Sequence, residues 1–407
     1  MIGLYFGTAL FIMKEEIAVK EYYLSELLEL KYGKDHKTLG NGTIPCYGSG
    51  GVIRYVNNSL YEKESILIPR KGSLNNLFFI NKPFWTVDTL FWSIINEKIV
   101  LPRYLFYKLK NLNLSSFNEG SAVPSLTTKT LNKISIKIHD LKLQEKIVSI
   151  LSLLDEKIEL NKKINQNLEE TAQTLFKRWF IDFEFPNEEG KPYKSNGGKM
   201  IESELGEIPE GWKIKNLLEV GDFINGLAMQ KYRPLDTEDS LKVIKIKEMN
   251  SGFSKESELC SVNIPDTYKV NFGDILFSWS GTLKVMFWDK ECGGLNQHIF
   301  KVIPKNVNKL FLYFWLKIHL QTFIQIAQSK ATTMGHIKRN DLNNSKIIVP
   351  NTEFWIYKEK ILNSYLEKIV YQSKEIEKLI ELRDYLLPRL MSGEIDISNL
   401  KISEISK

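Results

Sequence analysis

The sequence predicts an α+β protein: two tandem mixed α/β domains are joined by two long antiparallel helices that form an intramolecular coiled coil, with pseudo-two-fold symmetry. Three observations predict this fold class. The 407-residue chain repeats itself at a nearly constant spacing, each half ends in a long heptad pattern, and its 43% apolar and 26% charged residues are typical of globular proteins. At roughly 100–200 residues per domain, the length allows two to four domains.

The internal duplication is visible in matched segments. Residues 66–74 (ILIPRKGSL) match residues 275–283 (ILFSWSGTL), 209 positions later. Residues 120–131 match residues 331–342 with an offset of 211. Further pairs keep the offset of 209: Leu90 with Ile299, Phe91 with Phe300, Tyr104 with Tyr313 and Lys108 with Lys317. No single match is specific, but an offset held over most of each half is hard to obtain by chance.

Each half ends in a helical seam whose positions alternate three and four residues apart. The first seam is Leu151, Leu154, Ile158, Asn161, Asn165, Leu168, Ala172, Leu175 and Trp179. Adding 211 gives the second seam, Leu362, Tyr365, Ile369, Gln372, Ile376, Leu379, Arg383, Leu386 and Leu390. Asn161 and Gln372 make both seams polar near the middle, which costs stability but fixes register. Because neither helix can bury its seam alone, the shared register favours pairing of the two helices over two unrelated surface helices.

The predicted order is globular unit, long helix, globular unit, long helix. The predicted boundaries are 13–142 and 205–350 for the units, 143–185 and 351–393 for the helices, 186–204 for a linker and 394–407 for a tail. The linker is expected to be flexible, since it is rich in Pro, Gly, Asn and charge without an apolar period. The tail is expected to pack near the first unit or to fray.

The first twelve residues are apolar but lack the basic region and cleavage site of a secretory signal. We therefore expect residues 1–12 to be a non-native extension and Met13 to be the natural start. No segment shows the roughly 18 consecutive apolar residues of a membrane helix, so we expect a cytoplasmic protein without a membrane partner. Three distant cysteines and five histidines argue against a disulfide framework or a metal site.

The charge distribution favours a polyanionic partner. The net charge is +6 for the chain, and the excess lies in the two globular units rather than in the helices. Two basic units on a rigid spacer suit a polyanion that is contacted at two separated places. An excess of this size is also common in proteins that bind nothing charged, so the charge is weak evidence by itself.

Polar, basic and aromatic residues gather in predicted loops at equivalent places of the two halves. Ser, Thr, Asn and backbone N–H groups bind phosphates, whereas Arg, Lys, Asn, Gln and His can also read base edges. The candidate DNA-binding residues are Arg54, Tyr55, Arg70, Lys71, Ser73, Asn75, Ser121, Lys129, Trp279, Ser280, Thr282, Lys284, Lys330, Thr332, Thr333, His336, Lys338 and Arg339. For any one of them taken alone, an ordinary turn is the favoured explanation. The loops together suit two readers of different sequences on one scaffold, because both copies are polar while their residues differ.

The Gly-rich segment 47–55 lacks the Gly-Lys-Ser/Thr of a phosphate-binding loop and a complete GxGxxG pattern, so a tight strand–turn–strand is favoured there. The chain has no Walker A, G-x-S-x-G or HExxH motif. It also lacks the Asn/Asp-Pro-Pro-aromatic loop of an amino-methyltransferase and the paired carboxylates and lysine of a common metal nuclease. We therefore predict a recognition protein with no catalytic residues of its own.

The two helical regions carry a family resemblance. Residues 143–183 (LQEKIVSILSLLDEKIELNKKINQNLEETAQTLFKRWFIDF) and 382–396 (LRDYLLPRLMSGEID) resemble the central and C-terminal conserved regions of the specificity subunits of type I restriction-modification enzymes. Residues 207–212 (EIPEGW) are similar to the opening of a second target-recognition domain. The resemblance covers nearly the whole chain from about Met13.

This resemblance implies two target-recognition domains that each read one half of a split, asymmetric site in double-stranded DNA. The helix pair would set the gap between the half-sites and offer docking faces to two modification subunits. Those subunits would bring S-adenosylmethionine and methylate a flipped adenine, and translocating restriction subunits with ATP and Mg would cut. The chain itself would hold no cofactor and no metal.

Two departures from the family and several alternatives remain. The extension 1–12 is unusual, and Arg383 occupies a seam position, which suggests that this end of the second helix contacts a modification subunit rather than its mate. A recognition subunit of a methylation-only or type IIB-like system is one alternative. A coiled-coil scaffold that binds protein is another, and a metal-independent enzyme has no motif in its favour.

Overall fold

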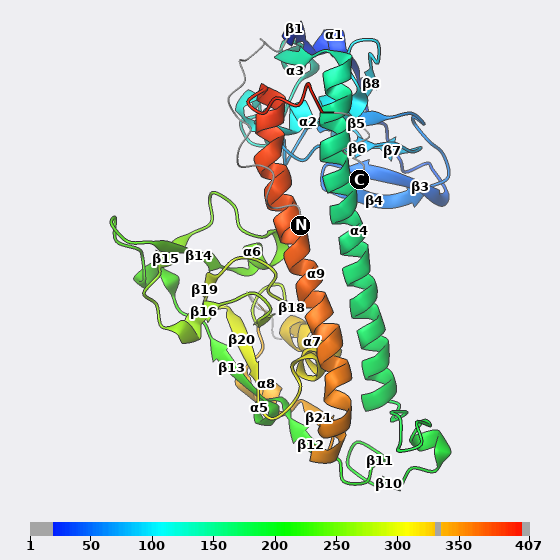
Figure 1. The fold of residues 1–407 in the computed structure, drawn as a ribbon, viewed down its shortest axis with the longest axis vertical. Coiled ribbons are helices and arrows are strands. Elements are labelled where there is room, and N and C mark those ends of the chain that lie inside the picture. Colours follow the sequence, from blue (N-terminus) through cyan, green and yellow to red (C-terminus); the bar gives the residue numbers. More distant parts are fainter. Residues whose placement is uncertain (1–18, 330–334, 401–407) are drawn as a thin grey trace. The chain divides into compact units, whose positions relative to one another are not determined.

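The computed structural model describes residues 19–329 and 335–400, which form two compact units. The first unit contains residues 19–157 and 380–400, and the second contains the described part of 158–379. Each of the two long helices therefore contributes one part to each unit (Figure 1). The predicted extension 1–12, Met13 and the candidates Lys330, Thr332 and Thr333 lie outside the described residues.

The first unit is built around a four-stranded sheet with the order β2-β8-β5-β6. Its strands are β2 (Leu28–Tyr32), β5 (Ser65–Pro69), β6 (Phe78–Ile80) and β8 (Leu90–Ile95). A second sheet, with the order β4-β3-β7, contains β3 (Asn41–Gly48), β4 (Gly51–Val56) and β7 (Trp85–Thr86). The remaining elements are the pair β1 (Val19–Tyr23) and β9 (Ser135–His139), and the helices α1 (Leu24–Leu27), α2 (Pro102–Lys110) and α3 (Thr128–Asn132).

The second unit has the same kind of main sheet, with the order β13-β20-β17-β18. Its strands are β13 (Gly221–Asn225), β17 (Ile275–Ser278), β18 (Lys284–Phe287) and β20 (Ile299–Pro304). The second sheet, β15-β14-β19-β16, contains β14 (Ser240–Ile244), β15 (Leu259–Ser261), β16 (Lys269–Val270) and β19 (Gly293–Leu295). The pair β12 (Lys213–Asn216) and β21 (Lys346–Val349) and the helices α5 (Leu217–Val220), α6 (Ile246–Ser251), α7 (Lys309–Ser329) and α8 (Arg339–Asn343) complete it.

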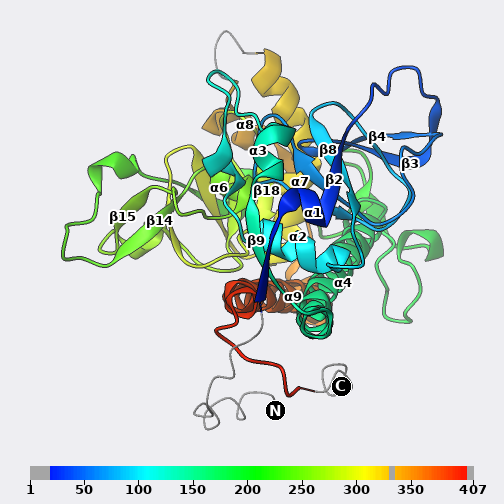
Figure 2. The ribbon, with the colours of Figure 1, turned by 90° about the horizontal axis from the view of Figure 1, so that it is seen from above.

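The strand registers confirm the duplication. Tyr32 of β2 pairs with Phe91 of β8, and Asn225 of β13 pairs with Phe300 of β20, with Phe91 and Phe300 at the predicted offset of 209. The helices α3 and α8 begin at Thr128 and Arg339, which is the predicted offset of 211. The register also reveals an offset of 193 between β2 and β13 that the sequence comparison missed. In both views, β3–β4 and β14–β15 lie at the outer edge of their own unit (Figures 1 and 2).

The long helices are α4 (Leu141–Phe180) and α9 (Thr352–Ser392), close to the predicted 143–185 and 351–393. Every predicted seam residue is buried or half-buried and none is exposed. In the first unit, Leu387, Leu390 and Met391 of α9 join the same core as Ile147 and Leu151 of α4. In the second unit, the Asn165 amide of α4 donates to the Ser373 hydroxyl of α9 over 2.8 Å.

The structure corrects the interpretation of Arg383. Its guanidinium forms an ion pair with Asp155 of α4, 3.1 Å between Nη1 and Oδ1, within the first unit. The Tyr107 hydroxyl of α2 donates to the other oxygen of the same carboxylate. Arg383 therefore contacts the mate helix, because the Asp155 carboxylate balances its charge there, and the suggestion that it faces a modification subunit instead is wrong.

The segment 186–204, which was predicted to be a flexible linker, makes contacts with the second unit. The short strands β10 (Met200–Ile201) and β11 (Ile208–Pro209) pair with each other. The Phe185 ring stacks on both Tyr193 and Trp212, with centroids 4.5 and 5.1 Å apart. These aromatic contacts anchor the segment in the core of the second unit, which a count of polar and turn residues does not reveal.

The helix α7 is the exception to the expectation that no segment suits a membrane. Among the described helices it alone is long and apolar enough to cross one, by length and composition. Half of its most apolar window is buried, and Phe311, Phe314 and Leu316 belong to the core of the second unit. The packing of this core explains its composition.

The described part of the chain after Gly393, residues 394–400, packs back on the first unit. Ile395 and Ile397 contact its core, and the Lys146 side chain of α4 donates to the Ser398 carbonyl. The Lys108 ammonium of α2 also donates to the Met391 carbonyl at the end of α9, over 2.6 Å.

Candidate nucleic-acid interface

Three polar loops of the first unit converge on one surface. The backbone N–H of Leu126 donates to the Arg70 carbonyl, and that of Gly72 donates to the Pro124 carbonyl, both over 2.9 Å. The Asn76 side chain donates to the Ser49 carbonyl over 2.7 Å, which adds the Gly-rich turn between β3 and β4. We call residues 47–51, 70–77 and 118–126 the first loop cluster. The turn confirms the strand–turn–strand predicted for 47–55.

The second unit repeats the two backbone hydrogen bonds of this arrangement. The backbone N–H of Ile337 donates to the Trp279 carbonyl over 3.0 Å, and that of Gly281 donates to the Gly335 carbonyl over 3.2 Å. These residues are the equivalents of the first cluster at the predicted offsets of 209 and 211. We call residues 278–284 and 335–339 the second loop cluster.

Glycine is required at one equivalent position of both clusters. Gly72 has φ +90° and Gly281 has φ +66°, a backbone conformation that other residues rarely adopt. Each glycine turns the chain just after a strand of the main sheet, β5 or β17. The turn lets its backbone N–H bond to the later loop, at Pro124 or Gly335. The two clusters therefore share their backbone frame, and only their side chains differ.

The predicted site residues of the first unit fall into two groups. Lys71, Ser73, Ser121, Lys129 and Tyr55 are exposed and face solvent. The others hold the loops together: Arg54 donates to the Leu39 carbonyl and to Asn41, Arg70 to the Asp88 carbonyl, and Asn75 to Asn113.

The predicted site residues of the second unit show a similar division. Thr282, His336 and Lys338 are exposed, whereas Ser280 is buried beneath the loop. The Trp279 indole is half-buried and donates to Asn225 over 2.9 Å. Lys284 and Arg339 have structural partners, since they donate to the Met249 and Phe223 carbonyls over 2.8 and 2.9 Å.

Sequence reasoning missed several polar residues that the fold brings to these clusters. Tyr32, Asp88 and Thr89 lie beside Arg70, and Asn225 and His298 lie beside Trp279. The sequence repeat could have identified Asp88 and Thr89. They directly precede the matched Leu90, and they are equivalent to Gln297 and His298 at the offset of 209. No local signal marks Tyr32 and Asn225, which reach the cluster through sheet pairing.

The cysteines show how burial limits nucleophilic chemistry in the described residues. Burial raises the pKa of the Cys46 thiol and raises that of Cys260 to about 11. The pKa of Cys292 is also raised, again chiefly by burial. A reactive cysteine needs a lowered pKa, so these three thiols are protonated at neutral pH and are not activated nucleophiles.

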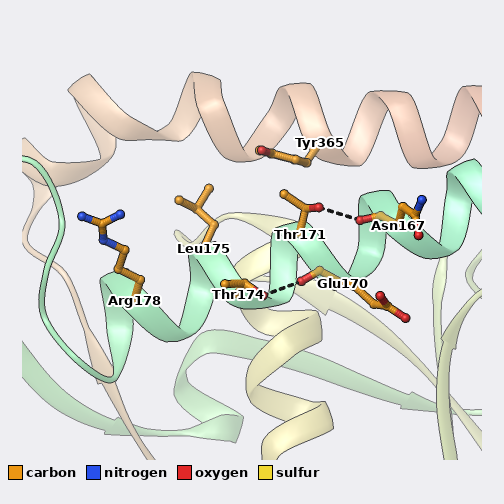
Figure 3. Close-up of a pocket in the computed structure, with 7 residues that line it drawn as sticks. All are labelled: Asn167, Glu170, Thr171, Thr174, Leu175, Arg178 and Tyr365. Carbon is orange, nitrogen blue, oxygen red and sulfur yellow. Dashed lines mark hydrogen bonds between the residues drawn. The ribbon is translucent and has the colours of Figure 1, made fainter.

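A groove between α4 and α9 is the second notable surface of the second unit (Figure 3). It has a volume of about 600 Å³, and Thr171, Leu175 and Arg178 of α4 line it opposite Tyr365 of α9. A second, more apolar groove continues along the same pair, with Ile164 and Leu168 opposite Ser364, Lys368 and Tyr371. The residues 164, 168, 171, 175 and 178 form one helical face, so the two grooves follow one stripe.

The first unit carries the equivalent stripe on its own parts of the two helices. Leu382, Leu386 and Arg389 of α9 correspond to Thr171, Leu175 and Arg178 at the offset of 211. Leu153 and Leu382 are exposed there, although both are large and apolar. Such exposed apolar stripes are typical of interaction surfaces.

The fold and its two surfaces define a class of protein: a duplicated α+β chain with two equivalent polar loop clusters and two long helices, suited to recognition. The family described as the type I restriction modification DNA specificity domain matches residues 17–170 and 209–382. The chain therefore belongs to the family of type I restriction-modification specificity subunits, which are DNA-binding proteins of restriction systems.

Two relatives and one solved structure agree with this family. The MjaIX specificity subunit of Methanocaldococcus jannaschii is 29% identical, over 84% of this chain and 80% of that protein. The HindI specificity subunit of Haemophilus influenzae is 28% identical, over 80% and 85%. The fold is similar to the type I S subunit from M. genitalium, with a TM-score of 0.57 and 15% identity over 93% and 98% of the two chains.

Proposed function

We propose that this chain is the non-catalytic subunit that gives a type I restriction-modification complex its DNA specificity. Each unit binds one half of a bipartite, asymmetric site in double-stranded DNA through its loop cluster. One observation carries the proposal: the two clusters keep the same backbone hydrogen bonds at equivalent residues and present different side chains. One frame with two sets of side chains is what reading two different half-sites requires.

We propose further that α4 and α9 form one antiparallel coiled coil that sets the distance between the half-sites. The Asp155–Arg383 ion pair in the first unit and the Asn165–Ser373 hydrogen bond in the second support it, because the α9 partner moves back from 383 to 373 as the α4 partner moves forward from 155 to 165. The 40 residues of α4 span about 60 Å at about 1.5 Å per residue. That length corresponds to roughly 18 base pairs at about 3.4 Å each.

The two helix stripes are the proposed docking faces for two modification subunits. Their equivalence at an offset of 211 supports two copies of one partner. Those subunits would supply S-adenosylmethionine and methylate a flipped adenine. Restriction subunits with ATP and Mg would join them, and the assembly would work in the cytoplasm without a membrane, cofactor or metal in this chain.

Binding-site selection from random duplex DNA, followed by footprinting of the full chain, tests the proposal. We expect two short specified sequences separated by a gap of fixed length and free sequence. Replacing residues 13–142 by the corresponding domain of another specificity subunit should change one half-site and keep the other. A chain that selects no bipartite sequence would favour the alternative of a coiled-coil scaffold that binds protein. A methylation-only or type IIB-like system would show the same site, and methylation mapping with and without restriction subunits separates these systems.

A further inference from the structure

One side chain lies at the centre of the first loop cluster. The Arg70 Nη1 donates to the Asp88 carbonyl over 3.1 Å and lies 3.9 Å from the Asp88 carboxylate. The guanidinium lies 5.5 Å from the centroid of the Tyr32 ring. The backbone N–H of Arg70 donates to the Thr89 carbonyl over 2.8 Å. The next residue, Lys71, forms an antiparallel β-bridge with Ser125.

A different side chain occupies the same place in the second loop cluster. The Trp279 indole donates to the Asn225 side chain over 2.9 Å, and its ring lies 5.7 Å from His298 and 6.3 Å from His336. The backbone N–H of Trp279 donates to the His298 carbonyl over 3.3 Å. The Gln297 amide lies 3.2 Å from the His298 Nε2.

The surrounding residues are equivalent one by one. Tyr32 and Asn225 occupy the same place in the strand register, opposite Phe91 and Phe300. The other equivalent pairs are Arg70 with Trp279, Asp88 with Gln297, Thr89 with His298, and Ser125 with His336. The side chain differs at all five positions, whereas the backbone bond from position 70 or 279 to position 89 or 298 is kept.

We call the five residues of the first unit the first set and their five equivalents the second set. The two sets offer different hydrogen-bonding groups. The first set combines a guanidinium, a carboxylate and a phenol. Arg is suited to the O6 and N7 acceptors of guanine, and a carboxylate accepts from the N4 amine of cytosine. The second set contains no Arg, Lys, Asp or Glu: it combines an indole, an amide at 225, an amide at 297 and two imidazoles. Amide side chains are suited to adenine N6 and N7.

Unused hydrogen-bonding capacity points to a ligand at these positions. Tyr32 and the Asp88 carboxylate are more than half exposed, so their polar atoms face solvent. In the second unit, the His298 Nδ1 is buried and has no hydrogen-bond partner within the described part of the chain. A buried polar atom without a partner costs free energy that a bound hydrogen-bonding group can recover.

We propose that these five equivalent positions are the specificity determinants of the two units. The first set selects a G·C pair in its half-site, and the second set selects an A·T pair in the other. This inference rests on the proposed function and adds to it the residues that choose the bases. The exposed loop lysines Lys71 and Lys338 bind phosphates and do not choose between sequences.

The test uses the full chain and binding-site selection from random duplex DNA, with Asp88→Asn for the first set and Gln297→Ala for the second. Each variant should lose roughly tenfold or more of the discrimination at one or two adjacent base pairs of one half-site. The other half-site should stay unchanged. Glu64→Gln and Gln321→Ala, at exposed positions outside the clusters, are the matched controls and should select the wild-type sequence.

The outcomes separate this inference from the proposed function. Variants that select the wild-type bipartite sequence with unaltered base preferences would overturn the inference and leave the proposed function standing. A wild-type chain that selects no bipartite sequence would overturn both. Because Asp88 is exposed, Asp88→Asn should unfold like the wild type, so altered selection by this variant reflects recognition. His336→Gln is a second exposed variant of the other set and should alter the same half-site as Gln297→Ala.

Discussion

Arg383 of α9 and Asp155 of α4 are 228 positions apart in the sequence, and their side chains form an ion pair of 3.1 Å. Both side chains are at least four-fifths buried. The Tyr107 hydroxyl adds a hydrogen bond of 2.6 Å to the same carboxylate. This group joins three helices of the first unit, so it fixes which residues of α4 and α9 lie opposite each other there.

The Asp155–Arg383 pair should contribute measurably to stability. Asp155→Asn and Arg383→Gln should each lower the free energy of unfolding by about 2 kcal/mol, because each leaves a buried partner charge with weaker compensation. The double variant should lose less than the sum, with a coupling of about 1–2 kcal/mol in urea denaturation. The exposed Lys162–Glu159 pair is the control, and Glu159→Ala should cost less than about 0.5 kcal/mol. If the losses in unfolding free energy of the two single variants simply add up in the double variant, the two side chains do not stabilise each other.

His139 should make the stability of the first unit depend on pH. Burial, and to a smaller extent the nearby Lys108 ammonium, lowers the pKa of His139 to about 4. The Tyr104 hydroxyl lies 2.8 Å from its Nδ1. As the pH falls from 6.5, the usual pKa in an unfolded chain, towards 4, the unfolded chain takes up a proton that the folded chain does not. The free energy of unfolding therefore falls with pH, by about 2 kcal/mol at pH 5 relative to pH 7.

The variant His139→Asn isolates this effect from the titration of carboxylates. The amide keeps a polar atom near the position of Nδ1 and does not titrate. The difference in unfolding free energy between wild type and variant, measured in urea at pH 7 and pH 5, should change by about 2 kcal/mol. Equal changes with pH in both proteins would show that His139 does not titrate differently in the two states.

Lys71 and Lys284 should behave differently when truncated, although both lie in loop clusters. Lys71 is exposed, so Lys71→Ala should weaken DNA binding for all sequences and reduce the slope of log K against log salt by about 1. Lys284 donates to the Met249 carbonyl and to Asn250, so Lys284→Met should instead cost about 1 kcal/mol of stability. Salt titrations of binding and urea denaturation check both. An unchanged slope for Lys71→Ala, with Lys71→Arg as control, would remove it from the interface.

Shortening both helices by one heptad should shorten the gap between the half-sites. Deleting residues 158–164 together with 369–375 removes seven residues from each helix and keeps the shared offset. Seven residues correspond to about 10 Å, or about 3 base pairs. Whole-genome methylation mapping of the assembled complex should show both half-sites with this shorter gap. An unchanged gap would refute the role of the helices, and deletion from one helix alone should lower stability because it breaks the register.

Charges in the helix stripes should remove the modification subunits one at a time. Ile164→Glu with Tyr371→Glu alters the stripe of the second unit, and Leu153→Glu with Leu382→Glu alters that of the first; all four side chains are exposed. Each double variant should fold and keep one modification subunit, because a charge in an apolar contact costs several kcal/mol. Mass measurement of the assembled complex checks this. Gln173→Glu, exposed on another face of α4, should bind two subunits as the wild type does.

The repeat, the extent of the long helices and the buried seams could be predicted because they depend on local periodicity. A seam position such as Leu151 or Leu362 is recognised from residues three and four places away, and both are fully buried. The offset of 211 also placed α3 and α8 correctly. Arg70, Trp279 and His336 were identified as candidate site residues from the composition of their loops alone.

The tertiary structure decided which of these residues meet and what their side chains do. Tyr32 and Asn225 reach the loop clusters through antiparallel pairing with strands that lie about 60 to 75 residues later, and no pattern near them in the chain marks this. A charged Arg383 is unexpected at a seam position, and the fold explains it by placing Asp155, held by Tyr107, beside it. Periodicity is a property of neighbouring residues, so the sequence determined the elements and their repetition. The partners of charged and polar side chains depend on contacts between distant segments, so only the folded chain determined which residues form the sites.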